Sequence, residues 1–195
     1  MIYGAYKNVR NSAWKCLIDF KVCELPVKPA VIAKTAGIKL IKNSDVHELD
    51  LHESGKSIYD GSQWYVIYDN ENTRQRCRFT IAHELGHIFL GHQLRKGYHA
   101  RTFDITKPAV EQEADAFAAR LLAPACVLWA LEAHSAEEIS ALCDISKMAA
   151  QIRAERMEIL YKRNKFLASS LERKVYDNFS DFIKNNKTKN PRQYR

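Results

Sequence analysis

The sequence predicts a mostly helical α+β domain with a small β-sheet. Apolar residues make up 46% of the 195 residues, which is enough to build a folded core. Most segments between turn-forming residues place their apolar side chains at helical spacing. Two short runs, at residues 38–42 and 64–68, instead have the β-branched and aromatic composition of strands.

Proline and glycine positions set the limits of the first elements. Apolar residues near helical spacing predict a helix over residues 9–24, before Pro26 breaks the pattern. Pro29 can open a short helix that runs to about Ala36, and Gly37 suits the turn into the first strand. A polar stretch at residues 43–61 then separates the two strands.

The best-marked helix follows the second strand. Asn72 with Gln75 three residues later resembles a capping box, so we expect a helix from about Thr73 to Leu90. Gly91 stands where helices favour a left-handed exit, so the helix should end there.

The rest of the chain is predicted to be helical. A loop at residues 93–107 leads to a helix over residues 108–123, which Pro124 stops. We expect further helices through residues 126–133, within residues 135–163 and at about 169–184, and then a frayed tail.

The net charge of +7 arises in the C-terminal part. From Arg153 onward there are twelve Lys and Arg against five Asp and Glu, so the preceding residues balance to zero. Such a segment serves solubility, and it also suits nucleic acid or an acidic partner. No apolar run is long enough for a signal peptide or a membrane span, and the five scattered cysteines form no CxxC pair. We therefore expect a cytoplasmic protein with buried thiols and no membrane partner.

The stretch "FTIAHELGHIFLGH", residues 79–92, contains the pattern of a metal site. On a helix, His83 and His87 lie about 40° apart on one face, so both rings can reach one ion. Glu84 lies about 100° from His83, beside the ion rather than on it, where it can handle a water molecule. This predicts two zinc ligands and a general base, provided that a third protein ligand exists.

Two residues are candidates for that third ligand. His92 is one residue short of the HExxHxxGxxH spacing, so we assign it to the helix end or behind the ligands. In "VEQEADAFAARLL", Glu111 can complete a His/His/Glu set. Asp115 shares its face and can accept the second ring N–H of His83, whereas Glu113 points about 200° away from Glu111.

The expected chemistry is hydrolysis. Zinc polarises a carbonyl and acidifies water, while Glu84 takes a proton and delivers it to the leaving amine. An oxyanion-stabilising group is also expected. Tyr98, His99 and His134 are the candidates, and spacing does not choose among them.

The segments "QRCRFTIAHELGHIFLGH" and "EQEADAFAARLLAP" resemble the ImmA/IrrE family of zinc metallopeptidases, and the resemblance covers about residues 60–165. It implies a zincin-like metallopeptidase core, with a small β-sheet packed on the HExxH helix, over residues 1–134. A helix-turn-helix-like segment (135–165), to which "SAEEISALCDISKMAAQIRAERMEIL" is similar, would follow. The basic C-terminal helix and tail (166–195) is not part of the resemblance.

The same resemblance implies residue roles and a substrate. It makes His83, His87 and Glu111 the ligands of one Zn²⁺ per chain, and Glu84 the general base and acid. Family members often carry Asn or Ala at the position of Asp115, so its role rests on geometry alone. Such proteins in phages and mobile elements cleave a helix-turn-helix repressor encoded beside them, and others act in stress regulation.

Two other functions are alternatives. One is a DNA-binding transcriptional regulator that uses the helix-turn-helix-like segment and the basic C-terminus. Its second helix has Arg153 and Arg156 but is otherwise largely apolar, and its turn "CDIS" lacks the usual glycine. The other is a pseudoenzyme with structural zinc, which the intact Glu84 argues against.

Overall fold

A computed structural model describes residues 3–92 and 109–189 of the chain. Contacts between Cα atoms divide it into two compact units. The first comprises Met1–Ala13 and Lys28–Ala118, and the second comprises Trp14–Val27 and Ala119–Arg195. The boundaries expected from the sequence, at residues 134 and 165, separate segments by their expected function rather than by compactness. They stay a prediction.

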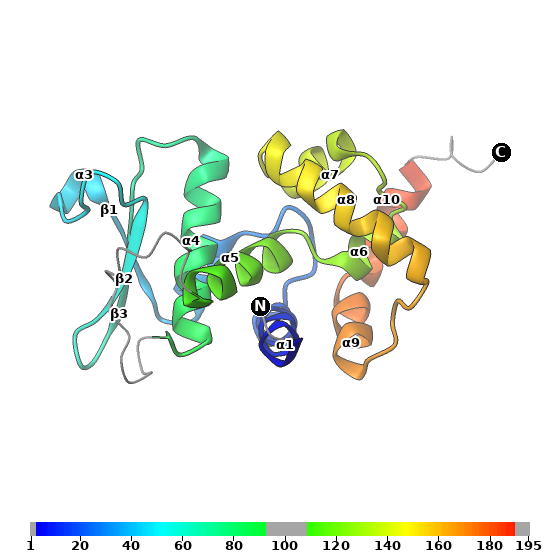
Figure 1. Cartoon of the computed structure of the whole chain (residues 1–195), viewed down its shortest axis with the longest axis horizontal. Coiled ribbons are helices and arrows are strands. Elements are labelled where there is room, and N and C mark those ends of the chain that lie inside the picture. Colours follow the sequence, from blue (N-terminus) through cyan, green and yellow to red (C-terminus); the bar gives the residue numbers. More distant parts are fainter. Residues whose placement is uncertain (1–2, 93–108, 190–195) are drawn as a thin grey trace. The chain divides into compact units, whose positions relative to one another are not determined.

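The first unit combines a small sheet with helices (Figure 1), which confirms the predicted α+β class. The helix α1 (Tyr3–Asp19) begins in this unit and ends in the second, and α5 (Ala109–Leu122) does the same. The other elements are α2 (Pro29–Thr35), β1 (Lys39–Lys42), α3 (Asn43–Val46), β2 (Gly55–Tyr59), β3 (Trp64–Tyr68) and α4 (Arg74–Phe89).

The three strands have the order β1-β3-β2, with β3 in the centre. Val66 of β3 pairs in parallel with Leu40 of β1 and antiparallel with Ser57 of β2. The sheet packs against α4, which contacts both β2 and β3. Val66 and Ile67 are both buried, and since neighbouring side chains point to opposite faces, the central strand is covered on both sides.

Strand β2 lies in the polar stretch where the sequence predicted no element. Its residues, "GKSIY", lack the apolar alternation that marks a half-buried strand. Pairing with β3 and the close approach of Gly55 to Thr80 of α4 hold it in place instead. Both contacts are tertiary, which is why local composition did not reveal the strand.

Helix α4 confirms the best-marked helix of the sequence, with a cap one residue later than predicted. Thr73 is the N-cap and accepts a hydrogen bond from the Arg76 N–H at 3.3 Å. Asn72 instead donates to the Asp69 carboxylate at 2.6 Å. Leu90 is the C-cap, and Gly91 has φ +66, as a left-handed exit requires.

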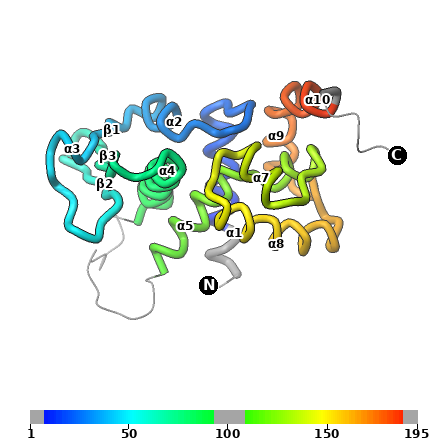
Figure 2. Tube along the Cα trace, turned by 90° about the horizontal axis from the view of Figure 1, so that it is seen from above, coloured from blue at the N-terminus to red at the C-terminus, as the bar shows by residue number. Residues whose placement is uncertain are grey.

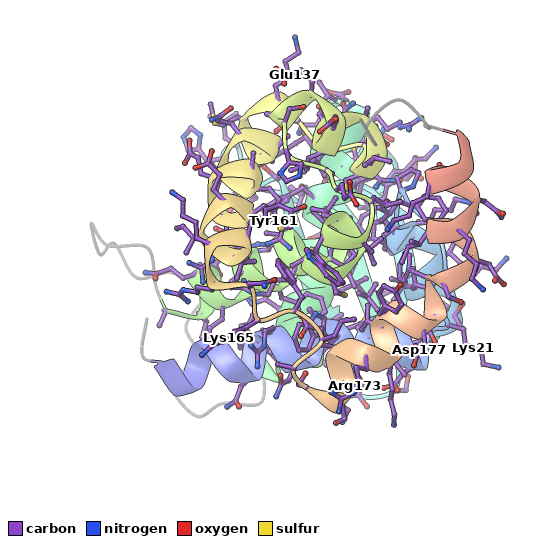
Figure 3. All side chains as sticks on the ribbon, turned by 90° about the vertical axis from the view of Figure 1, so that its right-hand side faces the viewer. Lys21, Glu137, Tyr161, Lys165, Arg173 and Asp177 are labelled. Carbon is purple, nitrogen blue, oxygen red and sulfur yellow. The ribbon has the colours of Figure 1, made fainter. Side chains whose placement is uncertain are left out.

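The second unit is helical over its described residues. Two of its helices, α7 and α8, pack against each other and lie side by side in Figure 2. Figure 3 labels Tyr161, which belongs to α8, and Arg173 and Asp177, which belong to α9. Its elements are α6 (Ala125–Ala130), α7 (Ala136–Cys143), α8 (Lys147–Arg163), α9 (Ser170–Asn178) and α10 (Ser180–Lys189).

Two helix predictions need correction. The first helix begins at Tyr3 and ends at Asp19, earlier than the range 9–24. The last predicted helix is two helices, because the chain turns at Phe179, and the second continues to Lys189. This turn lets both Phe179 and Ile183 be buried. No helix within the described residues is long and apolar enough to cross a membrane.

Candidate metal centre

The residues of the predicted metal site come from two neighbouring helices of the first unit. His83, Glu84 and His87 lie on α4, and Glu111 and Asp115 lie on the N-terminal part of α5. A Cβ placed on Gly86 would be 3.2 Å from the Ala114 Cα and 3.2 Å from the Phe117 Cβ. Such a contact is tighter than most real Cβ contacts, so Gly86 lets the two helices approach each other closely.

The approach brings three donor groups together. The Nε2 atoms of His83 and His87 are 3.0 Å apart. The carboxylate of Glu111 reaches both rings, with Oε2 3.2 Å from the His83 Nε2 and Oε1 3.3 Å from the His87 Nε2. Within the described residues, these three form the one group of His, Cys, Asp and Glu side chains arranged to hold a metal ion.

The donor set fits zinc. Tetrahedral zinc with bonds of about 2.0–2.1 Å to nitrogen holds its ligands about 3.3 Å apart. The three separations here, 3.0, 3.2 and 3.3 Å, are close to that value. Two imidazoles and one carboxylate also form a donor set typical of catalytic zinc, which keeps a fourth position for water or substrate.

Asp115 lies where the four-residue spacing from Glu111 predicted. Its Oδ1 is 2.9 Å from the His83 Nδ1, so the carboxylate accepts that ring N–H and leaves Nε2 facing the other donors. Burial lowers the pKa of His83, but hydrogen bonds to Asp115 and Glu111 outweigh this effect and raise the pKa to about 9. Hydrogen bonds from His83 and His87 lower the pKa of Glu111. The negative charge that favours a proton on His83 equally favours a cation.

Glu84 is buried beside the donors, with 7% of its surface exposed. Burial raises the pKa of its carboxyl, while His83, His87 and a hydrogen bond with Ser57 act in the opposite direction. Ser57 belongs to β2, so sequence reasoning missed this partner along with the strand. A buried carboxylate with a raised pKa is a stronger base than an exposed one.

The site opens into a cavity of about 760 Å³. All five predicted site residues line it, together with residues 52–57, which lead into and form part of β2. Its size lies within the range of about 300–1,000 Å³ that is usual for ligand sites. A segment of a larger substrate can therefore reach the donors.

His92 and Glu113 also lie near the site, although no specific contact was predicted there for either residue. His92 is fully buried, and its Nδ1 is 3.0 Å from the His87 Nδ1. Glu113 is 8% exposed, and its Oε2 is 2.9 Å from the His92 Nε2. His92 therefore lies behind the ligands, one of its two predicted placements.

Of the three candidate oxyanion stabilisers, the structure describes only His134. Tyr98 and His99 lie outside the described residues. His134 belongs to the second unit, where its ring stacks on Tyr161 with 4.5 Å between centroids. The assignment of an oxyanion-stabilising residue thus stays open among the three.

Comparison with known proteins identifies the family. The sequence model of Peptidase_M78, described as the IrrE N-terminal-like domain, matches residues 33–155. The match includes the whole donor set and covers more than half of the chain. No curated protein matches the sequence of this chain. The chain therefore belongs to the ImmA/IrrE family of metallopeptidases, Peptidase_M78.

Proposed function

We propose that this protein is a zinc-dependent endopeptidase of the HExxH-plus-glutamate, gluzincin-like type that cuts a peptide bond in a regulatory protein. The observation that carries the proposal is the convergence of His83, His87 and Glu111 on one point, with the buried Glu84 beside it. Zinc held by these three residues would supply Lewis acidity to the peptide carbonyl and to water.

Each other residue then has a defined task. Glu84 accepts a proton from the water that attacks the peptide carbonyl and passes it to the leaving amine. The Ser57 hydroxyl orients the Glu84 carboxylate, with which it is hydrogen-bonded. Asp115 fixes the tautomer of His83, so that Nε2 is available as a ligand.

The position of β2 favours an extended peptide as substrate. This strand is last in the order β1-β3-β2 and borders the cavity at residues 55–57. An end strand presents backbone N–H and C=O groups with which an extended chain can pair. A peptide bound in this way would run past Glu84.

The proposed substrate class is a helix-turn-helix repressor of a phage or mobile element, which the family resemblance suggests. The cavity lining supports a basic peptide, because Glu48, Asp50 and Glu53 outnumber Lys56 and Arg76 there. DNA-binding proteins are rich in basic segments, since they neutralise phosphates.

The test is co-expression with the repressor encoded beside this protein. Glu84→Gln should still bind one zinc per chain, but cleavage should fall at least about 100-fold because the base is lost. Glu71→Gln makes the same change in the exposed turn before α4 and should cleave as the wild type does. If the wild type leaves the repressor intact, this substrate is wrong. If Glu84→Gln cleaves it like the wild type, the role of Glu84 is wrong.

The alternative, a DNA-binding regulator, has less support. Of the two arginines on α8 that would contact phosphates, Arg153 donates to the Ala123 carbonyl within the second unit. Met148 and Ile152, which are 77% and 63% exposed, are apolar. DNA binding by the full chain that falls steeply with salt would favour this alternative.

A further inference from the structure

Behind His87 lies a buried chain of polar side chains that reaches α5. It runs from the His87 Nδ1 to the His92 Nδ1, 3.0 Å away, and from the His92 Nε2 to the Glu113 Oε2, 2.9 Å away. The exposed fractions are 3% for His87, 0% for His92 and 8% for Glu113. Side chains as polar as these stay buried only when hydrogen bonds compensate for the lost water.

The contacts fix where the protons lie. The Nε2 of His87 faces His83 and Glu111, so it must be free of hydrogen when it binds a metal. The proton of the neutral ring is then on Nδ1, which donates to the His92 Nδ1. An accepting Nδ1 leaves the His92 proton on Nε2, where it meets the Glu113 carboxylate. Each of the two contacts then has one donor and one acceptor, with Glu113 at the end.

The fold explains how His92 reaches this position. Gly91, with φ +66, ends α4 in a left-handed turn, so His92 does not continue along the helix face. The rings of His87 and His92 meet edge to face, with centroids 4.9 Å apart. Glu113 lies opposite on α5, two residues from Glu111, so α5 contributes both to the donor set and to the polar side chains behind it.

The two histidines of the site are therefore supported in different ways. His83 donates its Nδ1 proton directly to a carboxylate, that of Asp115. His87 reaches a carboxylate only through a second imidazole, and it is the more buried of the two, at 3% against 14% for the side chain. A hydrogen bond to the outer nitrogen of a ligating imidazole sets its tautomer and strengthens the donation from the inner one.

We propose that His92 and Glu113 form a positioning pair that holds His87 as the Nδ1–H tautomer with its Nε2 aimed at the metal. This inference rests on the proposed metal site and deepens it. The pair does not touch the reacting atoms, so its effect should be on metal affinity and on the state of the His87 ring.

The sharpest test compares two substitutions whose side chains have the same number and branching of heavy atoms. His92→Asn keeps an acceptor at the place of Nδ1, whereas His92→Leu removes it with little change in shape. Zinc affinity is measured by chelator competition, and the His87 ring nitrogens are followed by ¹⁵N NMR of the zinc-loaded protein. We expect His92→Leu to bind zinc about 10–100-fold more weakly than the wild type and to lose the slowly exchanging His87 Nδ1–H signal. His92→Asn should retain that signal and bind at least several-fold more tightly than His92→Leu.

Glu113→Gln provides a second test if the leucine variant does not fold. It retains an acceptor for the His92 N–H but removes the charge, so zinc affinity should fall by a smaller factor. The same change at the exposed Glu137 of the second unit is the control. Equal zinc affinity and equal NMR spectra for the two His92 variants, or a wild-type affinity for Glu113→Gln, would overturn the positioning pair. A wild-type chain that binds no zinc would instead refute the proposed metal site itself.

Discussion

Replacing Gly86 with alanine should weaken zinc binding, although alanine is the better helix former. The added Cβ would be 3.2 Å from three carbon atoms, namely the Ala114 Cα and the Cβ and Cδ1 of Phe117. Carbon atoms in contact prefer about 3.5–4.0 Å, so α4 and α5 must separate by about 0.3 Å or slightly more. One of the three is a backbone atom, and rotation of a side chain cannot relieve that contact.

This displacement acts directly on the donor set. His83 and His87 move with α4, and Glu111 moves with α5, so the gap opens between the imidazoles and the carboxylate. Metal sites tolerate deviations of about 0.2 Å in ligand distance. We therefore expect zinc affinity, measured by chelator competition, to fall about tenfold or more.

The effect on the free energy of unfolding is the balance of two opposing contributions. Overpacking costs about 1–3 kcal/mol. Alanine in place of glycine within a helix restores about 0.5–1 kcal/mol. Urea denaturation of the metal-free chain should then show a net loss of about 0–2.5 kcal/mol.

Gly37→Ala is the matched control for this prediction. Gly37 has φ +73 and no atom within 4 Å of an added Cβ, so alanine strains only the backbone there. That variant should lose about 1 kcal/mol of stability and keep its zinc affinity. If Gly86→Ala binds zinc as tightly as the wild type, the close approach of the helices does not set the donor distances.

Three further predictions concern the thiols and the helix caps. Burial raises the pKa of Cys16 and of Cys126 to about 12, so at pH 8 only about one thiol in ten thousand is a reactive thiolate. Iodoacetamide should label the exposed Cys23 in the native protein, as mass spectrometry can show, and reach Cys16 and Cys126 only after unfolding; rapid labelling of either buried thiol would contradict their burial. Thr73→Ala should lower the free energy of unfolding in urea by about 1 kcal/mol, because the Arg76 N–H loses its acceptor at the start of α4. Ser135→Ala should lower the free energy of unfolding by a similar amount, because it breaks the capping box of α7. For either variant, a loss below about 0.3 kcal/mol would show that water replaces the cap.

Helical periodicity predicted the elements that bear the donors. The interval of four residues placed His83 over His87 and Glu111 over Asp115, and the structure brings all four together. Both intervals lie within single helices, where geometry depends on local sequence alone. The start of α4 was one residue off because Asn72 and Thr73 are both good caps and their tertiary contacts decide between them.

The parts that sequence reasoning missed depend on contacts between distant segments. Strand β2 exists through its pairing with β3, so its short polar sequence carried no signal, and Ser57 was missed with it. Glu113 was assigned away from the site because it points about 200° from Glu111 around the helix axis. That angle is correct for α5 alone, but the turn at Gly91 brings His92 to the face of α5 that carries Glu113.

The three acidic residues at alternate positions of α5, Glu111, Glu113 and Asp115, thus serve two different faces of the helix. Glu111 and Asp115 face α4 directly, where one carboxylate joins the donor set and the other accepts the ring proton of His83. Glu113 faces a different direction. It is linked to His87 only because the turn at Gly91 places His92 between the two side chains. A third carboxylate on the first face would have added negative charge beside Glu84 and opposed its ionisation. Because Glu113 supports His87 through His92 instead, no further carboxylate is placed beside Glu84, and this repulsion is avoided.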